Sequence, residues 1–451
     1  MDASGLLLTD LYEVTMAAGY VRRGMREPAT FSLFVRTLPE SRGFLVAAGL
    51  EEVLDRLTDF EVTGEDVVWL ADRLGCSPGE LEALSGLGFE GDVWAVPEGR
   101  IVFPGEPLVE VTAPLPEAQL VETTVVNAVT YQTVLASKAA RCVLAAGGRP
   151  VVDFGLRRAH GAEAGIEAAR AGAMVGFAAT SNVAAGQRYG IPVTGTMAHS
   201  YVQAFPSEWA AFNAFADDFP ATPTFLVDTY DLGAGLAAAI EVIHVRGLAD
   251  RAAVRLDSGD PAQTAPFARR MLDAAGLPGV RIVASGGLDE YALDRLVRTG
   301  APVDVFAVGT KVTTSADAPV LDSAYKLVQL GDRPTRKRSP GKATLPGPKQ
   351  VWRPPAGPDL LCRRDEAGQT GSEALLVPVM RRGCRIDPPA PPRVALESAH
   401  ERFRRDLAWL PGDAGDVLHP AQPEPRTSDA LLALRDDVDA ALEHGRTHGT
   451  P

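Results

Sequence analysis

Cysteine is scarce in this sequence, with four residues in 451, at Cys76, Cys142, Cys362 and Cys384. They form no CxxC pair, and no histidine lies beside them at the spacing of a zinc finger. A disulfide framework or a structural zinc site is therefore not expected. Free thiols in a reducing compartment are the simpler interpretation.

Long apolar runs are also missing. The first residues, MDASGLLLTDLYEVTM, contain no basic region, and Thr9 and Asp10 interrupt their short apolar run. No stretch of about 18 apolar residues follows that could cross a bilayer. We therefore expect neither a signal peptide nor a membrane span, and we expect a cytoplasmic protein.

Basic residues are outnumbered by acidic ones, 44 to 58, which gives a formal net charge of −14. Binding to a phosphate backbone needs clustered Lys and Arg, so a nucleic-acid partner is not expected. Apolar residues make up 46% of the chain, which is ordinary for a globular protein. The length suggests two to three domains, because single cores rarely grow past about 250–300 residues.

Short β-branched or apolar runs recur through the middle of the chain. Such runs lie at 150–158, 191–200, 224–231, 252–260, 281–290 and 303–312. Helical segments rich in Ala, Leu, Arg and Glu separate them, and such alternation builds parallel sheets. The pattern predicts an α/β fold with a closed or nearly closed β/α barrel. An open, doubly wound sheet is the alternative.

The flanks of the chain have a different character. Residues 31–125 carry strand-like runs bounded by turn residues, which is typical of antiparallel β structure. Residues 331–358 are rich in Pro, Gly and basic residues and suit a loop between domains. Strand-like and helical segments follow, and we expect a poorly ordered tail after about residue 420.

Polar residues follow several of the predicted strands, where the active site of a β/α barrel forms. They are Asp153, Arg157, Arg158, Thr196, His199, Ser200, Arg255, Asp257, Ser258 and Asp260. Each has an ordinary explanation when taken alone. An arginine pair can face acidic surface residues, Asp257 or Asp260 can cap the helix near Pro261, and a lone histidine is more often a core residue.

Two glycine-led turns follow the last two predicted strands. They contain Ser285, Gly286 and Gly287 in ASGGLD, and Gly309 and Thr310 in AVGTK. Such turns offer free backbone N–H groups and the positive end of a helix dipole to a phosphate. A single one is usually a helix-entry turn, but two in succession late in a barrel indicate a phosphate site.

Seven motifs, in this order, resemble those of the nicotinate phosphoribosyltransferases. They are LLTDLYEVTMAAGY, FVRTLPESRGFLVAAGL, DFGLRRAHG, GTMAHS, RLDSGD, ASGGLDE and VGTKVTTSADAP. The resemblance covers residues 6–353 and continues more weakly to 410. It implies an irregular β/α barrel, residues 126–330, plus a discontinuous α/β sandwich domain built from both chain ends, residues 1–125 and 331–451.

The resemblance also implies a reaction. Nicotinate and phosphoribosyl pyrophosphate would give nicotinate mononucleotide and pyrophosphate, with ATP hydrolysis coupled to the transfer, in NAD biosynthesis. Mg²⁺ and a homodimer with active sites at the subunit interface are further implications. The diphosphate can carry most of the metal's coordination, and we predict no protein ligand for it.

His199 matches the family histidine that ATP phosphorylates. A neutral imidazole is nucleophilic, and imidazole is mostly neutral at cytoplasmic pH. The small neighbours Gly195 and Ala198 leave room for a γ-phosphate. Ser200 can hydrogen-bond that phosphate, and Thr196 is expected to bind substrate.

The remaining roles concern the other substrate groups. Phe154, together with Tyr12 of the neighbouring subunit, resembles the family's pair that stacks on the nicotinate ring. Arg157 and Arg255 would bind the nicotinate carboxylate or the substrate phosphates, and which takes which stays open. Asp257 would meet the ribose hydroxyls or orient Arg255.

Three rival functions are weighed against this one. Nicotinamide phosphoribosyltransferase carries an Asp after the second barrel strand, where GFAATSNVAAG has Thr180, Ser181 and Asn182. Such an Asp would repel nicotinate, so its absence favours the acid. Quinolinate phosphoribosyltransferases are much shorter and lack the GTMAHS motif. A catalytically inactive nicotinate- or nucleotide-binding homologue is the non-enzymatic alternative, although every nucleophile and charged anchor is present.

One departure from the family pattern lies close to the expected site. His160, in RRAHG, stands where several family members have Gln. It is either a tolerated polar exchange or a modulator of the pH profile.

Overall fold

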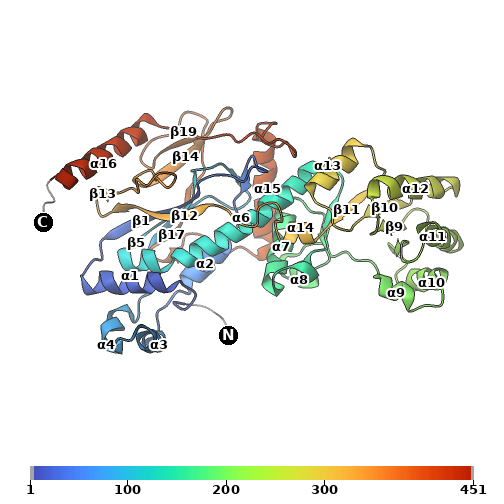
Figure 1. The fold of residues 1–451 in the computed structure, drawn as a ribbon, viewed down its shortest axis with the longest axis horizontal. Helices are drawn as coiled ribbons and strands as arrows, with labels where there is room; N and C mark the ends of the chain where they lie inside the picture. The colour runs from blue at the N-terminus through green and yellow to red at the C-terminus, as the bar shows by residue number, and fades with distance from the viewer. Residues whose placement is uncertain (1–4, 448–451) are drawn as a thin grey trace.

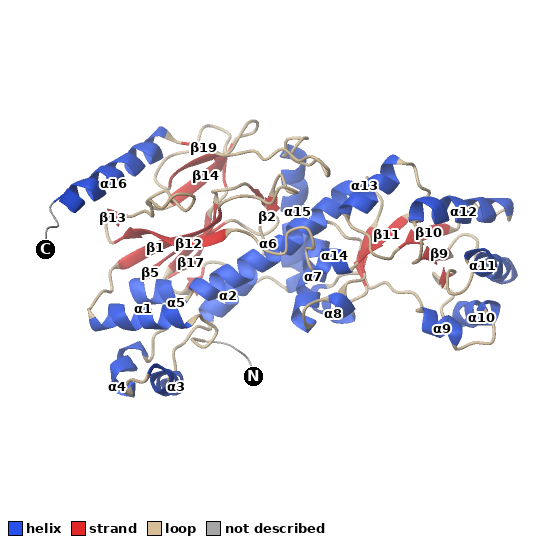
Figure 2. Ribbon diagram, in the orientation of Figure 1, coloured by secondary structure: helices blue, strands red, loops and turns tan. Residues whose placement is uncertain are grey.

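The computed structural model describes residues 5–447, and residues 1–4 and 448–451 lie outside the described part. The fold is a mixed α/β fold in which a parallel sheet curls into a half-barrel. Figure 1 shows the half-barrel at the right and a larger antiparallel sheet at the left, with α6 (Glu122–Ala145) between them. Figure 2 shows that helices cover the outer face of the half-barrel.

Six strands form the half-barrel sheet, and every pairing in it is parallel. In spatial order they are β7 (Ala179–Thr180), β6 (Val151–Asp153), β11 (Val305–Val308), β10 (Arg281–Ala284), β9 (Ala253–Leu256) and β8 (Thr224–Leu226). The sheet ends at β7 and β8. The predicted parallel β/α arrangement is present, but the sheet is a half-barrel of six strands, fewer than the eight of the common closed β/α barrel.

Five of the six predicted runs contain a strand of this sheet, and the run at 191–200 does not. That run makes one isolated bridge, between Val193 and Thr180, and its residue His199 already begins helix α9 (His199–Gln203). Pro192 and Gly195 interrupt the run, since proline lacks a donor for a ladder and glycine weakens a strand. The strand at this edge of the sheet is instead the two-residue strand β7.

The helices of the half-barrel region follow its strands in the order that βα units require. They are α7 (Ala162–Val175), α8 (Val183–Tyr189), α9 (His199–Gln203), α10 (Glu208–Asp218), α11 (Leu232–Arg246), α12 (Pro261–Ala274), α13 (Glu290–Arg298) and α14 (Thr310–Thr313). Asp260 caps α12 by accepting a hydrogen bond from the backbone of Ala262, with Pro261 as the first helical residue. Asp257 is not the cap and is free for another role.

A seven-stranded sheet combines strands from both ends of the chain. In spatial order they are β13 (Arg333–Pro334), β12 (Ser323–Leu330), β1 (Pro28–Val35), β5 (Pro107–Pro114), β3 (Asp92–Ala95), β17 (Val377–Arg381) and β18 (Cys384–Arg385). β1 lies inside the sheet, antiparallel to both β12 and β5. Phe31 of β1 stacks on Tyr325 of β12 with their ring centroids 4.8 Å apart. The antiparallel structure predicted for the N-terminal flank is confirmed.

Shorter strands and flanking helices complete this side of the molecule. The strands are β2 (Leu45–Val46), β4 (Ile101–Val102), β14 (Lys349–Arg353), β15 (Leu360–Arg363), β16 (Glu373–Ala374) and β19 (Arg426–Thr427). The helices are α1 (Leu11–Arg22), α2 (Leu50–Thr58), α3 (Gly64–Leu74), α4 (Pro78–Leu81), α5 (Leu115–Leu120), α15 (Pro392–Trp409) and α16 (Asp429–Thr447). A buried ion cluster joins β14 to α15, because Arg353 contacts Asp359 at 2.6 Å and Asp406 at 2.7 Å.

The C-terminal tail differs from the sequence prediction. We expected poor order after about residue 420, but the chain forms β19 and the 19-residue helix α16. Leu431 is fully buried, and Asp439 forms ion pairs with Arg336 and Arg338. The sequence did not reveal these ion pairs, because Asp439 belongs to an acidic tail and the two arginines lie about a hundred residues before it. Residues 448–451 lie outside the described part.

No helix within residues 5–447 is both long enough and apolar enough to cross a membrane. All four cysteines are free thiols, with Cys142 and Cys362 buried.

Candidate active site

Arg255, the third residue of β9, is the centre of a hydrogen-bonded cluster at the carboxyl ends of the half-barrel strands. Its guanidinium donates to the hydroxyl of Ser285 at 2.9 Å and to that of Thr196 at 3.0 Å. It also contacts an Asp257 carboxylate oxygen at 2.6 Å, and its carbon lies 5.4 Å from the centroid of the Phe154 ring. The structure thus brings together five residues that the sequence singled out separately.

Asp257 lies directly beside this arginine. Burial alone would raise the pKa of its carboxyl, but the hydrogen bond from Ser285 and the charge of Arg255 outweigh burial and hold that pKa below its usual value. The carboxylate is therefore ionised at neutral pH and acts only as an acceptor. Of the two roles considered for Asp257, the orientation of Arg255 matches this contact.

His199 starts α9 and lies at the edge of the cluster. Its Nε2 is 3.7 Å from an Asp257 oxygen, and its Nδ1 is 3.1 Å from the hydroxyl of Thr229. Its side chain keeps an exposed fraction of 38%, so the ring is held by neighbours and still open to a ligand. This position suits a nucleophile better than it suits a core histidine.

Asp228 and Thr229 follow β8, and the sequence interpretation assigned neither of them. One Asp228 carboxylate oxygen accepts backbone N–H groups from Asp257 at 2.7 Å and Ser258 at 2.6 Å. The other oxygen is buried without a hydrogen-bond partner. The strand-end rule applied to the other strands could have found both residues, since they follow TFLV directly.

The two predicted phosphate turns lie against this cluster. A Cβ on Gly286 would lie 2.1 Å from the carbonyl oxygen of Asp257, and Gly286 has a φ of 89°, which favours glycine. A Cβ on Gly309 would lie 3.0 Å from the carbonyl oxygen of Phe154. Gly286 therefore needs glycine for close backbone approach, whereas a side chain at Gly309 would require only a small shift of the neighbouring backbone.

The same close packing fixes Gly155, and it supports a testable prediction. A Cβ at Gly155 would lie 1.8 Å from the hydroxyl of Thr313, at the end of α14. We expect Gly155→Ala to push α14 away, to lower the free energy of unfolding by about 1–3 kcal/mol and to reduce activity. Thermal unfolding and steady-state turnover check this. Gly64→Ala, at the start of α3, is the matched control, because nothing lies within 4 Å of its Cβ position; equal losses in the two variants would contradict the explanation.

Three predicted residues lie apart from the cluster. Arg157, in the short 3₁₀ helix η2 (Leu156–Arg158), and Ser200 of α9 are exposed, and within residues 5–447 neither side chain forms a hydrogen bond or ion pair. Tyr12 lies on α1, at the opposite end of the molecule from β9 and β10 (Figure 1). Within one chain, Tyr12 does not reach the cluster.

The end of β7 is held by internal hydrogen bonds. The hydroxyl of Thr180 donates to one Asp153 carboxylate oxygen at 2.7 Å, and the backbone N–H of Gly155 donates to the other at 2.8 Å. Asn182 is fully buried and caps α8. The Asp153 carboxylate is therefore occupied by local donors.

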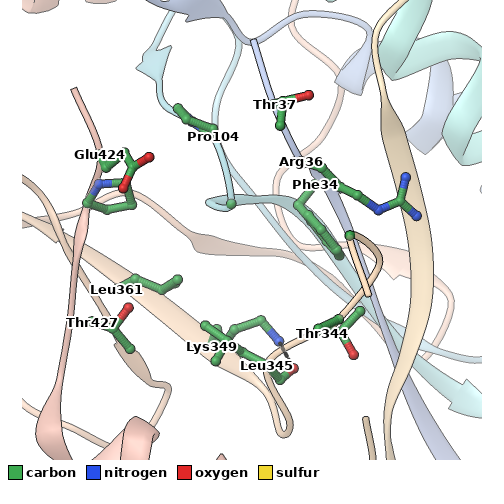
Figure 3. Close-up of a pocket in the computed structure, with 14 residues that line it drawn as sticks. Phe34, Arg36, Thr37, Pro104, Thr344, Leu345, Lys349, Leu361, Glu424 and Thr427 are labelled. Carbon is green, nitrogen blue, oxygen red and sulfur yellow. Dashed lines mark hydrogen bonds between the residues drawn. The ribbon is translucent and has the colours of Figure 1, made fainter. Parts of the chain in front are cut away.

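A separate pocket of about 460 Å³ lies against β1, β14 and β15 (Figure 3). None of the predicted site residues lines it. Its buried amine, that of Lys349, donates to the carbonyl oxygen of Gly347 at 2.8 Å and lies 3.2 Å from Glu110. Because internal acceptors use this amine, the pocket is not a candidate for the reaction.

Metal-binding capacity in the cluster is small. Within the described residues, no group of three or more His, Cys, Asp and Glu side chains is placed to hold a metal ion. Two carboxylate oxygens of the cluster are candidates: the buried one of Asp228 that has no partner, and the one of Asp257 that lies 3.7 Å from Nε2 of His199. Hard carboxylate oxygens of this kind fit Mg²⁺ when a substrate diphosphate provides the other ligands.

Comparison with known proteins agrees with the resemblance found in the sequence. Residues 7–130 match the model of the nicotinate phosphoribosyltransferase N-terminal domain, and residues 150–331 match that of the nicotinate phosphoribosyltransferase family. The chain is 48% identical to a Mycobacterium tuberculosis protein named nicotinate phosphoribosyltransferase pncB2, over 98% of this chain and 96% of that protein.

Two further relatives agree. A Bacillus subtilis nicotinate phosphoribosyltransferase is 44% identical, over 78% of this chain and 74% of its own. The crystal structure of the human nicotinic acid phosphoribosyltransferase superposes with a TM-score of 0.83 at 31% identity, covering 95% of this chain and 99% of that one.

Proposed function

The chain belongs to the nicotinate phosphoribosyltransferase family, and we propose that the cluster around Arg255 and His199 is its catalytic centre. The protein is an enzyme that transfers phosphoribose to nicotinate, in the salvage of nicotinate to NAD. The observation that supports the position of the site is that Arg255 joins Thr196, Asp257 and Ser285 beside His199.

The transfer exchanges two bonds at the anomeric carbon of the ribose. The ring nitrogen of nicotinate attacks this carbon, the carbon–oxygen bond to the diphosphate breaks, and pyrophosphate leaves with the electron pair. Positive charge develops on the ribose and negative charge on the leaving group. Arg255 stabilises the anionic groups, and Asp257 keeps its guanidinium oriented by the 2.6 Å contact.

Base recognition requires a flat apolar surface and a cation. We assign Phe154 to one face of the nicotinate ring, and the cation–π contact with Arg255 holds that phenyl ring at the strand end. Arg157 is exposed and unpaired within residues 5–447, so it can turn toward a carboxylate or a phosphate. The Ser285–Gly287 and Gly309–Thr310 turns are proposed to hold phosphate groups through their backbone N–H groups.

ATP coupling is assigned to His199. An unprotonated ring nitrogen attacks the γ-phosphorus of ATP, the bond between that phosphorus and the bridging oxygen breaks, and ADP leaves with the electron pair. The resulting phosphoimidazolium carries a positive ring charge next to the Asp257 carboxylate. Thr229 holds the ring, and the exposed Ser200 one residue later can donate to the phosphoryl group.

Mg²⁺ is proposed as the metal, bound mainly through the diphosphate. It would neutralise charge on the leaving group. The sequence suggested no protein ligand, but we now propose that the Asp228 oxygen that is buried without a partner would help to hold the metal, with Asp257 as the second protein oxygen. The Asp228 carboxylate is kept in place by the two backbone N–H groups that it accepts.

A homodimer with shared active sites is proposed because of α1. Leu7, Leu11, Tyr12 and Met16 lie on or next to this helix and have exposed fractions of 51%, 52%, 47% and 38%. An apolar patch of this kind is typical of a surface that another protein covers. A second subunit docked there would place Tyr12 over a half-barrel, opposite Phe154.

We also propose the division into a discontinuous sandwich domain, residues 1–125 and 331–451, and a barrel domain, residues 126–330. The seven-stranded sheet supports a discontinuous domain, because β1 pairs there with β12 and β3 pairs with β17. Since β12 (Ser323–Leu330) belongs to this sheet, the second boundary lies before residue 323. We propose the cytoplasm as the compartment, which suits four free thiols.

Nicotinate should be used far better than nicotinamide, and this choice separates the proposed function from its nearest rival. An arginine hydrogen bond to a carboxylate is worth about 1.5–3 kcal/mol, so we expect kcat/KM to favour nicotinate by about 10- to 100-fold. Thr180 and Asn182 at the end of β7 present no carboxylate that would oppose the acid. Steady-state assays with phosphoribosyl pyrophosphate and ATP measure both bases. Equal kcat/KM values for the two bases would contradict the proposed preference for nicotinate. If neither base is turned over, the alternative of an inactive binding homologue would be favoured.

A further inference from the structure

A buried ion cluster lies in the half-barrel region, and the mechanism above does not use it. It consists of Arg42, Lys138, Arg141, Glu290 and Asp317. Their side chains have exposed fractions between 0% and 10%. Burial of a charged side chain costs free energy, so a buried cluster of five charges calls for a structural or functional reason.

Lys138 of α6 is the central member of this cluster. Its amine contacts a Glu290 oxygen at 2.5 Å and an Asp317 oxygen at 2.7 Å. Burial alone would lower the pKa of this amine, but the two carboxylates outweigh burial and raise that pKa above its ordinary value. The amine is therefore charged at any pH at which the enzyme works.

The two carboxylates belong to the two proposed phosphate turns. Glu290 is the first residue of α13 and lies three residues after Gly287. Asp317 follows α14, seven residues after Thr310. One amine thus bridges the segments that follow two adjacent parallel strands, β10 and β11.

Two other contacts hold the same segments. At the rim, Lys311 contacts Asp289 at 2.6 Å, which joins the turns a second time. Below them, Ser315 has a φ of 44°, in the left-handed region that a serine seldom adopts. Its hydroxyl accepts a hydrogen bond from Arg42 at 2.7 Å and donates to the carbonyl oxygen of Ala318 at 2.8 Å. The segment after α14 is therefore fixed in one conformation by the cluster.

The charges of the cluster do not balance. Arg42, Lys138 and Arg141 are cations, and among residues 5–447 Glu290 and Asp317 are the only carboxylates that form ion pairs with them. One positive charge is left over below the turns, in a medium of low dielectric constant. This excess positive charge favours the binding of anions at the turns, even though no side chain of the cluster contacts the anion.

We propose that Lys138 is a positioning residue that fixes the separation of the two glycine turns, so that both bind the phosphates of one phosphoribosyl pyrophosphate molecule. The inference rests on the proposed function of these turns. Lys138 itself contacts no substrate. Without its amine, Glu290 keeps only its contact with Arg141 and Asp317 only its contact with Arg42, and no cation bridges the two carboxylates. Their mutual repulsion would then move the turns apart.

The test is a split between two Michaelis constants. Lys138→Met removes the charge and keeps most of the volume. We expect it to raise KM for phosphoribosyl pyrophosphate by about 10- to 100-fold, while KM for nicotinate and kcat change by less than about threefold. Lys138→Arg, which keeps a cation between the carboxylates, should restore most of the lost affinity.

The matched control is Arg353→Met. This variant breaks the other buried cluster, in which Arg353 contacts Asp359 and Asp406 far from the turns. It should lower the melting temperature, but it should not raise KM for phosphoribosyl pyrophosphate more than it raises KM for nicotinate. If it gives the same selective rise as Lys138→Met, or if Lys138→Met gives none, the positioning role is overturned.

Two further measurements cover the remaining outcomes. If Lys138→Met does not fold, Asp317→Asn keeps the Lys138–Glu290 pair and should raise the same KM by a smaller factor; an unchanged KM there also overturns the inference. Pyrophosphate titrated into the wild type tests the turns themselves. If the wild type does not bind it, the phosphate site of the proposed function fails, whereas binding with unchanged KM in the variants removes only the role of Lys138.

Discussion

His199→Ala is expected to abolish ATP hydrolysis while the protein still folds. The ring is 38% exposed and has one close hydrogen bond, at 3.1 Å to Thr229, so its removal leaves no large cavity and no buried unpaired charge. The transfer of phosphoribose itself needs no covalent histidine, because pyrophosphate is already an activated leaving group. Weak synthesis that does not respond to ATP should therefore survive, with poorer binding of phosphoribosyl pyrophosphate.

Labelling with γ-³²P-ATP measures the covalent step directly. The wild type should give a phosphoprotein that is labile in acid and stable in base, as expected of a phosphoramidate. His199→Ala should give none, and His160→Gln should label normally, because His160 is exposed and lies outside the cluster. Ser200→Ala should cost much less, since it removes one supporting hydrogen bond worth roughly 0.5–1.5 kcal/mol. Equal label in His199→Ala, or ATP stimulation that survives there, would show that this histidine is not the acceptor.

The sequence predicted that these polar side chains lie close together, because one rule applies to each strand separately. Polar residues at the carboxyl ends of parallel strands must meet, whatever the curvature of the sheet. Arg255, Asp257 and Ser285 follow this rule and lie within hydrogen-bond distance of one another. Asp228 and Thr229 follow the rule too, although they belong to none of the seven family motifs.

The shape of the sheet was harder to predict than its strands. Closure depends on how many strands pair around the sheet, and a two-residue strand such as β7 leaves almost no periodic signal. The run at 191–200 has more β-branched residues than β7, but its proline and glycine prevent continuous pairing. Tertiary context therefore decided which of the two segments became the strand.

Long-range contacts were beyond the reach of local patterns. The order of α16 depends on a buried Leu431 and on ion pairs between Asp439 and two arginines about a hundred residues earlier. Lys138 likewise appears in the sequence only as one polar residue of a long helix, and its two partners lie more than 150 residues away. Contacts between residues so far apart in the chain leave no local motif in a single sequence.

Mixing two inactive variants should restore activity if each active site is built from two subunits. Tyr12 lies on α1 and Arg255 lies in the half-barrel, at opposite ends of one chain in Figure 1. Tyr12→Ala and Arg255→Ala should each lose most activity, Arg255→Ala the more severely, because it removes several charge-assisted hydrogen bonds worth about 1.5–3 kcal/mol each. In an equal mixture with free exchange, half of the symmetric dimers are hybrids, and each hybrid has one intact site of two. The expected recovery is therefore about a quarter of the wild-type activity.

The matched control mixes Arg255→Ala with Ser285→Ala, two lesions that share one half-barrel cluster. No combination of these subunits produces an intact half-barrel, so this pair should recover nothing. Subunit exchange is verified with two affinity tags before activity is measured. Tyr12 does not reach the Arg255 cluster of its own chain. If activity recovers in the first pair and not in the control pair, the partner subunit must therefore supply Tyr12 to the active site. If exchanged dimers of the first pair stay inactive, or if the control pair recovers equally, Tyr12 does not complete the active site of a neighbouring subunit.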